Sequence, residues 1–218
     1  MNSVKLVAMT KPMIAGVETP EQFIAYCARV SNPSNQLNNE TAEKLLTYCV
    51  KNKHWSIFET VNIVLEIQTT RDIGRQILRH RSFSFQEFSQ RYAAVLDMHP
   101  PREARLQDQK NRQNSIETSD AELTERWILR QEQVLAAAKE AYQWGIEHGV
   151  AKEQARVVLP EGLTMSRMYM SGSLRSWLHY IQIRTEKGTQ KEHRLIAEQC
   201  KAIILEQFPS LSGCFDAE

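Results

Sequence analysis

The chain has 218 residues, of which 42% are hydrophobic and 24% charged, and its formal net charge is +1. These values are close to those of an average globular domain, so they exclude a disordered, collagen-like or coiled-coil chain. The near-zero charge gives no support for a nucleic-acid binder, which usually carries a clear basic excess. No apolar run approaches the ~20 residues of a membrane span, and the N-terminal segment lacks the sustained apolar core of a signal peptide, so we expect no membrane attachment.

The cysteines and glycines narrow the chemistry further. Cys27, Cys49, Cys200 and Cys214 form no C-x-x-C pair and none lies beside a histidine at ligand spacing. We therefore expect reduced thiols that act as small apolar residues, a cytoplasmic protein and no metal site. The eight glycines are scattered and form neither a G-x-G-x-x-G nor a P-loop motif. A nucleotide, if bound, would have to be held by side chains rather than by a glycine loop.

Helix and strand signals follow one another in the first part of the chain. A capping box with proline at the first helical position, at residues 19–22, predicts a helix over 20–31. Apolar residues at helical spacing predict a second helix over 40–51. Residues 61–67 are β-branched and mostly alternate with polar residues, which is typical of a strand.

A third helix is predicted directly after this strand. Thr69 or Thr70 is placed to cap it, and the helix is expected to contain Ile73, Ile77 and Arg79. The polar stretch over 97–117 then holds two prolines and is the longest loop expected in the chain. Loops of this length are usually functional or mobile.

The second half of the chain continues the helical pattern. A capping box at residues 119–122 opens the longest helix, which is expected to run to about 148 before Gly149. Residues 165–171 resemble a short strand, and an apolar stripe over 174–181 predicts another helix.

The last helix is predicted from a capping box at residues 189–192 and ends before Pro209. Six helices with few strands and no strict βαβ alternation favour the α+β class. We therefore predict a single domain over 1–218, with helices packed on a small mixed or antiparallel sheet.

The densest polar cluster lies over residues 71–92, which contain five arginines and only two acidic residues. Gln76, Arg79 and His80 are spaced to share one helix face, and such a set suits an anionic ligand that carries a ring. Two alternatives stay open at this point. The cluster is also typical of an ordinary basic helix C-terminus, or of a nucleic-acid patch in which interleaved aromatic residues stack on bases.

Four ordered segments make the chain resemble the flavin-dependent thymidylate synthases. Arg79-His80-Arg81, followed after seven residues by Ser89, matches the R-H-R-x7-S signature of that family. Residues 54–59 are similar to its H-x-[ST]-x-[FY]-E segment and residues 155–160 to its A-R-x-x-L-P segment. Residues 174–184 resemble its R-S-x-x-[NH]…R helix. The polar loop is most similar to that of virus-encoded members.

The resemblance implies a reaction. Members of this family methylate dUMP to dTMP, with methylenetetrahydrofolate as carbon donor and reduced FAD as hydride donor. NADPH reduces the flavin, and tetrahydrofolate leaves unoxidised. They are similar to one another in forming homotetramers with active sites shared between subunits. The implied partners are dUMP, the folate and NADPH, with no nucleic acid or membrane, and the implied location is the cytoplasm, of a host if the chain is virus-encoded.

The resemblance also implies roles for individual residues. The residues expected at FAD are Ser56, Arg79, His80, Arg81, Glu87, Arg175 and His179. The residues expected at dUMP are Gln76, Arg79, Glu87, Phe88, Ser89, Gln90, Arg91, Arg156 and Arg184. Arg184 would polarise the uracil ring, and His54 would lie near the flavin, as the catalytic pair. His179 departs from the family pattern, because many members have asparagine there.

Several of these residues have plainer interpretations. Arg156 could form an exposed ion pair with Glu153, and Arg184 could do the same with Glu186. His54 could be a satisfied core histidine.

Ser56 could simply cap a helix or turn, and residues 82–85 could be a plain strand. At the level of the whole protein, two other classes stay open: a basic-pocket binding module for nucleotides or single-stranded nucleic acid, and a flavin oxidoreductase that never handles folate.

Overall fold

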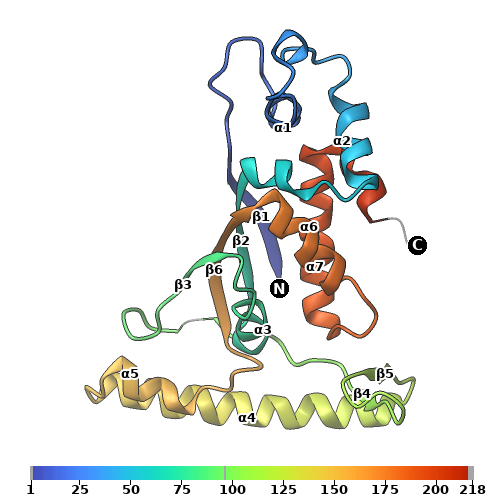
Figure 1. The fold of residues 1–218 in the computed structure, drawn as a ribbon. Coiled ribbons are helices and arrows are strands. Elements are labelled where there is room, and N and C mark those ends of the chain that lie inside the picture. Colours follow the sequence, from blue (N-terminus) through green and yellow to red (C-terminus); the bar gives the residue numbers. More distant parts are fainter. Residues whose placement is uncertain (1, 96, 216–218) are drawn as a thin grey trace.

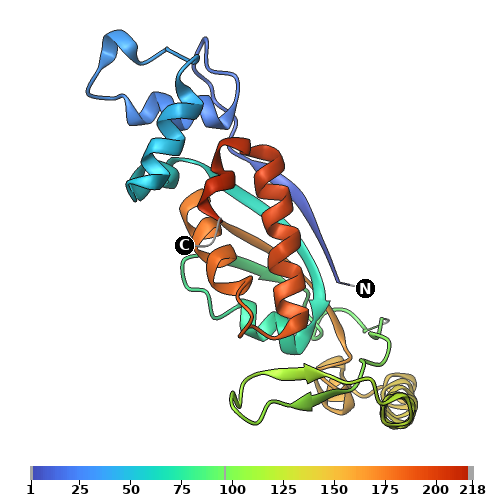
Figure 2. The same ribbon diagram turned by 90° about the vertical axis from the view of Figure 1, so that its right-hand side faces the viewer.

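The fold is built on a four-stranded antiparallel sheet, and the computed structural model describes residues 2–95 and 97–215. In spatial order the strands are β1 (Ser3–Met9), β2 (Asn62–Thr70), β6 (Met165–Ser173) and β3 (Ser84–Glu87). Two helices, α6 (Leu174–Arg184) and α7 (Lys191–Gln207), cover one face of the sheet (Figures 1 and 2).

The core lies between this sheet face and the two helices. Side chains of β2 alternate in burial, and Ile63, Leu65 and Ile67 are fully buried while their neighbours are partly exposed. Trp177 from α6 fills the space above β2, and its indole Nε1 donates a hydrogen bond to the backbone oxygen of Ile63 at 3.2 Å. One face of the sheet is therefore apolar and covered, as the alternation predicts.

The remaining elements surround this layer. The other helices are α1 (Pro20–Ala28), α2 (Ala42–Lys51), α3 (Arg71–Ile77), α4 (Ala121–Glu147) and the short α5 (Lys152–Ala155). A two-stranded hairpin consists of β4 (Arg105–Gln107) and β5 (Ser115–Glu117), and 3₁₀ segments cover Pro33–Asn35, Trp55–Thr60, Arg156–Val158 and Pro209–Cys214. Over the part of the chain that the structure describes, no helix combines the length and apolarity needed to cross a membrane.

The α+β class and the antiparallel sheet are confirmed. The capping box at residues 19–22 is also confirmed, because the Thr19 hydroxyl accepts a bond from the Gln22 backbone N–H at 3.2 Å. Boundaries differ by a few residues: α1 ends at Ala28, α2 begins at Ala42, and β2 and β6 both extend beyond the predicted strands.

Three predicted helix caps differ from the structure. Asp120 caps α4 in place of Ser119, with its carboxylate accepting from the Leu123 N–H at 2.8 Å. Thr70 is the N-cap residue of α3, as predicted, but its hydroxyl donates to Asp72 and makes no capping bond. The Thr189 hydroxyl donates to the Ile183 carbonyl, so α7 begins without a side-chain cap.

The polar stretch over 97–117 is not a plain loop. It contains the β4–β5 hairpin and is anchored through Arg102, whose guanidinium makes two 2.9 Å contacts with the carboxylate of Asp72. Gln131 of α4 holds the backbone N–H and C=O of Arg102, each at 2.8 Å. Strand β1 has no counterpart among the predicted elements, because it is an edge strand with mostly exposed side chains and a register shift after Leu6.

Helix α4 lies across one end of the molecule, apart from the sheet (Figure 1). Its contacts with the segments before and after it form a small second cluster, in which Val95, Tyr142 and Ala155 are buried. Much of its surface is apolar and open to solvent, and Trp127 and Trp144 are 48% and 59% exposed. An apolar surface of this kind is typical of an interaction site.

Gly172 marks a close approach between β6 and the ring of Phe83. A β-carbon at position 172 would lie 2.7 Å from Cε1 of that ring, which packs edge-on against Trp177 with ring centroids 4.8 Å apart. The ring has little room to move, because it is one of the buried residues of the main core.

We expect Gly172→Ala to lower the free energy of unfolding by about 1–3 kcal/mol, the usual cost of overpacking a core. Urea unfolding followed by circular dichroism measures the change. Gly188→Ala is the matched control, because nothing lies within 4 Å of a β-carbon there. Equal stability of the two variants would contradict the packing of Phe83 described above.

Candidate active site

One group of expected site residues gathers around α6. Arg175 Nη1 lies 3.0 Å from Glu59 Oε1, which joins α6 to the 3₁₀ segment Trp55–Thr60. The Ser176 hydroxyl donates to the backbone oxygen of Ser82 at 3.3 Å and so joins α6 to the chain after α3. Three of the four segments that carry the family resemblance therefore meet at one surface.

This surface is rich in exposed donors. Arg79, Arg81 and Arg175 are all exposed, and so is His179 on the outer face of α6. The prediction that α6 packs with one face and presents polar residues on the other is confirmed, because Leu174, Trp177 and Ile181 are buried.

His54 and Ser56 lie at the margin of the same surface and are both exposed. The core interpretation of His54 is therefore wrong; its ring instead lies edge-on to Tyr48. The capping interpretation of Ser56 is also wrong, because the 3₁₀ segment over Trp55–Thr60 has no side-chain cap.

Arg184, at the end of α6, contacts His80. Its Nε donates to His80 Nε2 at 2.9 Å, so the alternative interpretation of Arg184, an exposed ion pair with Glu186, is not the contact that the structure shows. Burial lowers the pKa of His80 to about 4, with further contributions from the positive charge of Arg184, from His179 and from Arg79. His80 is therefore neutral near pH 7, and its Nε2 lone pair is free to accept this bond.

Gln76 belongs to the same neighbourhood but not to one helix face with Arg79 and His80. Helix α3 ends at Ile77, so that prediction is wrong. The side chain of Gln76 instead contacts α7 through Gln190 at 2.7 Å and His193 at 3.2 Å.

A second group lies around the loop after β3. Arg91 Nε lies 3.2 Å from Glu153 Oε2, and Lys152 Nζ donates to the backbone oxygen of Tyr92 at 3.0 Å. These contacts put Ser89 and Arg91 on a cavity of about 420 Å³ beside α5, and Arg156 follows α5 directly. Glu153 pairs with Arg91, which is not the predicted pair with Arg156.

Residues 87–90 connect the two groups. Glu87 Oε1 accepts from the Ser166 hydroxyl at 2.8 Å and lies 3.6 Å from Arg71 Nη1, while the Phe88 N–H donates to the backbone oxygen of Arg167. Gln90 is only 4% exposed, yet its Nε2 has no hydrogen-bond partner among the residues described. A buried amide of this kind is usually satisfied in the functional state.

A larger cavity, of about 1530 Å³, lies elsewhere. It runs between α4, the β4–β5 hairpin and the start of α7, and none of the expected site residues lines it. Neither of these two cavities combines the group around α6 with the group after β3.

Comparison with known proteins decides the family. A family model described as thymidylate synthase complementing protein matches residues 12–210. A probable flavin-dependent thymidylate synthase of Paramecium bursaria Chlorella virus 1 is 52% identical over 214 residues, which are 98% of this chain and 99% of the relative. The chain belongs to the flavin-dependent thymidylate synthase family.

Two further similarities agree with this. The flavin-dependent thymidylate synthase of a Synechocystis strain is 47% identical over 217 residues, 98% of this chain and 99% of the relative. A crystal structure of the UMP/dUMP methylase PolB from Streptomyces cacaoi, bound with 5-Br dUMP, has a TM-score of 0.82 at 24% identity. It covers 99% of this chain and 94% of the other and shows that the fold is shared.

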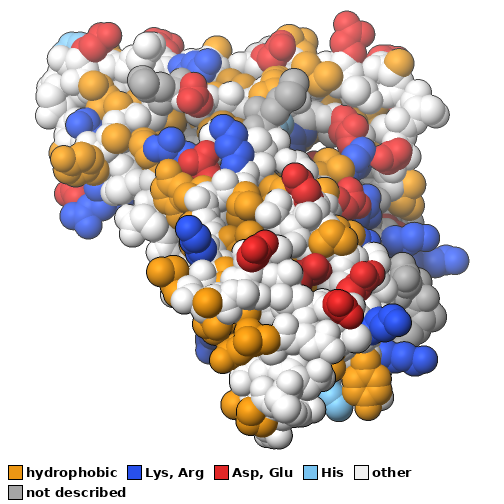
Figure 3. Space-filling model, turned by 90° about the horizontal axis from the view of Figure 1, so that it is seen from above, with side chains coloured by type: hydrophobic (Ala, Val, Ile, Leu, Met, Phe, Trp, Pro, Cys, Tyr) orange, Lys and Arg blue, Asp and Glu red, His pale blue; other side chains and the backbone are white. Residues whose placement is uncertain are grey.

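Family membership makes the chain a flavin-dependent thymidylate synthase, which is a methyltransferase. The alternative of a plain nucleic-acid module loses its support. Acidic and basic side chains are interspersed over the face seen in Figure 3, with no continuous basic stripe on that face. Among residues 2–95 and 97–215, no group of three or more His, Cys, Asp or Glu side chains is arranged to hold a metal ion.

The site residues predicted from the sequence did not include three residues that contact them. Tyr180, Gln190 and His193 form hydrogen bonds within the network around Gln76, and all three lie on α6 or at the start of α7. Residues 189–192 stood out in the sequence only as a capping box. The sequence therefore showed that Gln190 and Glu192 are polar, but it did not show that Gln190 contacts Gln76 on α3.

The neutral state of His80 gives a direct test. We expect its ring to titrate near pH 4 in an NMR experiment, with the signal assigned from a His80→Gln variant. Because this folded pKa lies below the ordinary value of 6.5, the neutral ring favours the fold above pH 6.5, and that contribution is lost as the pH falls toward 4.

Arg184→Gln should raise the pKa of His80, since one neighbouring cation is removed, while burial keeps it below 6.5. Arg175→Gln, on the outer face of the same helix, should leave the pKa unchanged. A wild-type His80 that titrates at 6.5 would contradict the neutral acceptor.

Proposed function

We propose that this chain methylates dUMP to dTMP with methylenetetrahydrofolate as carbon donor, reduced FAD as hydride donor and NADPH as the reductant of the flavin, and that it releases tetrahydrofolate. The observation that carries the proposal is the Arg184–His80 hydrogen bond at 2.9 Å. This bond holds the Arg184 guanidinium in a defined orientation beside a surface of exposed arginines. Arg184 and His80 both lie at positions that match the family's motifs.

The residues around α6 fit FAD. Arg79, Arg81 and Arg175 are exposed guanidinium groups on one surface, and such groups suit a diphosphate. Ser56, His80, Glu87 and His179 complete the set that would hold the cofactor. Bound reduced FAD supplies a hydride for the methylene carbon.

Arg184 would act on the uracil ring. Its Nε is occupied by His80, so its two terminal nitrogens are left to face the substrate. A fixed cation beside the N3–C=O edge stabilises negative charge on the ring and makes C5 more nucleophilic. Gln76 and Arg79 would bind the nucleotide from the same side, and His54 would control access to the flavin.

The loop after β3 would bind the phosphate. Ser89, Arg91 and Arg156 offer a hydroxyl and two guanidinium groups, which suit a dianion. Glu87, Phe88 and Gln90 would shape the rest of the loop. The buried, unpaired Nε2 of Gln90 supports a ligand or a neighbouring subunit at this position.

We infer that the active enzyme is a homotetramer with shared sites. The two groups of site residues belong to different parts of one chain, and neither of the two cavities described above combines them. Helix α4 and the segment after it expose a broad apolar surface, including Val157 at 82%, that a second copy would cover.

No cysteine is needed as a nucleophile in this scheme. Burial raises the pKa of all four thiols, that of Cys214 to about 12 and that of the fully buried Cys200 still further. At neutral pH these groups are protonated and unreactive.

The decisive assay follows the folate product. The FAD-loaded protein with NADPH, dUMP and methylenetetrahydrofolate should yield dTMP and tetrahydrofolate in equal amounts. Dihydrofolate in stoichiometric amount would rule out a flavin-derived hydride. NADPH oxidation without dTMP would instead favour an oxidoreductase that does not handle folate.

Replacement of Arg184 tests the ring-polarising role. Arg184→Ala should lower kcat by on the order of 10²-fold or more, the usual loss for a preorganised charge-stabilising group, while the flavin spectrum is retained. Arg184→Lys should restore only part of the lost kcat, since an ammonium group lacks the planar fork of a guanidinium. Arg194→Ala, which breaks only a 3.9 Å pair with Glu198 on α7, is the control and should keep its turnover.

The same variant tests whether the site is shared. Arg184→Ala and Arg156→Ala chains, each inactive alone, are co-expressed and purified as mixed particles. With the two residues supplied by different chains, random assembly leaves about one quarter of the sites intact. Mixed particles no more active than either parent would place the whole site within one chain.

A further inference from the structure

His193 occupies a position that the proposed reaction does not explain. It lies in the first turn of α7, has no solvent exposure, and uses both ring nitrogens. Nδ1 lies 3.2 Å from Gln76 Oε1, and Nε2 lies 3.1 Å from the hydroxyl of Tyr180. A buried histidine with two specific partners is costly unless both bonds are made.

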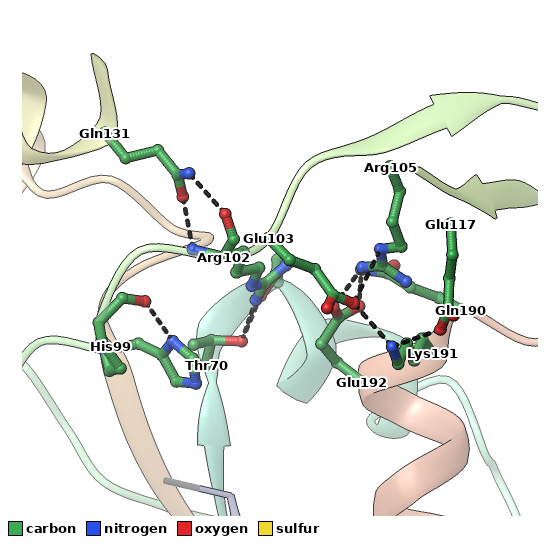
Figure 4. A network of polar contacts seen from close by, with 12 residues as sticks. Thr70, His99, Arg102, Glu103, Arg105, Glu117, Gln131, Gln190, Lys191 and Glu192 are labelled. Atoms are coloured by element: carbon green, nitrogen blue, oxygen red, sulfur yellow. Dashed lines mark hydrogen bonds and ion pairs between the residues drawn. The ribbon is translucent and has the colours of Figure 1, made fainter. Parts of the chain in front are cut away.

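The bonds around it run in one direction, and the charge of Glu192 sets that direction. Arg105 pairs with one oxygen of this carboxylate, and the amide nitrogen of Gln190 donates to the other at 2.9 Å (Figure 4). A carboxylate can only accept, so Gln190 must turn its Nε2 toward Glu192 and its oxygen toward Gln76.

The same logic continues to His193. Gln76 must then donate from Nε2 to Gln190, at 2.7 Å, and accept at Oε1. The proton of the His193 ring therefore lies on Nδ1, and Nε2 accepts from the Tyr180 hydroxyl. Burial lowers the pKa of His193 to about 3, with contributions from Arg184 and His80, which keeps the ring neutral as the network requires.

The result is a Gln76 amide that cannot flip. Its Oε1 and one hydrogen of its Nε2 are occupied, and the second hydrogen has no partner over residues 2–95 and 97–215. Gln76 thus presents only an N–H donor to a ligand. The same network supports His80, because the Tyr180 ring packs edge-on against it with centroids 4.9 Å apart.

We propose that His193 is a positioning residue that fixes the Gln76 amide so that its free N–H donates to an acceptor oxygen of dUMP. The inference rests on the proposed function, because it takes Gln76 as a dUMP contact. His193 itself touches no substrate atom and acts through Gln76.

Two replacements separate the bonds of His193. His193→Asn keeps a donor at the position of Nδ1 and so keeps the bond to Gln76. His193→Gln keeps an acceptor at the position of Nε2 for Tyr180, but it leaves Gln76 Oε1 unpaired and free to turn toward the ligand. Each variant loses one buried hydrogen bond, so a purely structural role predicts equal effects.

The measurement is the Kd of dUMP for the FAD-loaded protein, by calorimetry. We expect His193→Gln to weaken binding by about tenfold and His193→Asn by less than about threefold, as one hydrogen bond predicts. In a Gln76→Leu background, His193→Gln should have no further effect on Kd. Cys200→Ala, a buried change on the same helix, should leave Kd unchanged.

The outcomes distinguish the two levels of the proposal. Wild-type protein that does not bind dUMP overturns both the proposed function and the role of His193. Wild-type protein that binds dUMP, with His193→Asn and His193→Gln equally weakened, overturns the positioning role alone. A loss in Cys200→Ala equal to that in His193→Gln does the same, because it would assign the effect to packing.

One readout needs no variant to fold. The ¹⁵N spectrum of the wild-type histidine rings reports which nitrogen of His193 carries the proton. We expect the Nδ1–H tautomer. The Nε2–H tautomer would reverse the direction of the network, leave Gln76 facing the ligand with its oxygen, and overturn the proposal.

Discussion

The packing of α6 against the sheet is the constraint that determines the rest of the site. Strand β6 passes into this helix without a loop, and the Leu174 N–H donates to the Val61 carbonyl at 2.8 Å where the helix begins. Trp177 and Tyr180 are then fully buried against β2 and α7. Once these large side chains are in place, the rotation of the helix is fixed, and so is the direction in which its polar residues point.

This arrangement explains how one short helix serves packing and chemistry together. Its inner face contributes several of the largest buried side chains, while Arg175 and His179 lie on the outer face. Arg184 comes at the C-terminal end, where carbonyl groups favour a cation and where His80 approaches from the segment that follows α3.

Much of this could be predicted from local sequence. Capping boxes and apolar spacing located the six main helices, alternation located the central strand β2, and the capping box at 19–22 is present as expected. Features set by distant contacts could not be read in the same way. Strand β1 is held by pairing with β2 rather than by its own pattern, and the Thr189 hydroxyl binds Ile183 because the chain turns back between α6 and α7.

In the candidate site, too, local sequence signals could be predicted and features set by distant contacts could not. Motif spacing and the family resemblance selected Arg79, His80 and Arg184, and the last two are in contact. The neutral state of His80 depends on burial by α6 and α7, which no spacing of residues along the chain reveals. His193 was invisible for the same reason, since its partners are 13 and 117 residues away along the chain.

The attachment of α4 has a mechanical consequence. This helix is not bound to the sheet by a broad apolar interface; its first half is tied to α3 through Gln131, Arg102 and Asp72. The Arg102 and Asp72 side chains of this tie are only 17% and 28% exposed, so dissolved ions screen their charge pair less than they screen a pair on the open surface. The first half of α4 therefore keeps its position across ordinary salt concentrations, and an assembly built on that helix would keep its geometry as well.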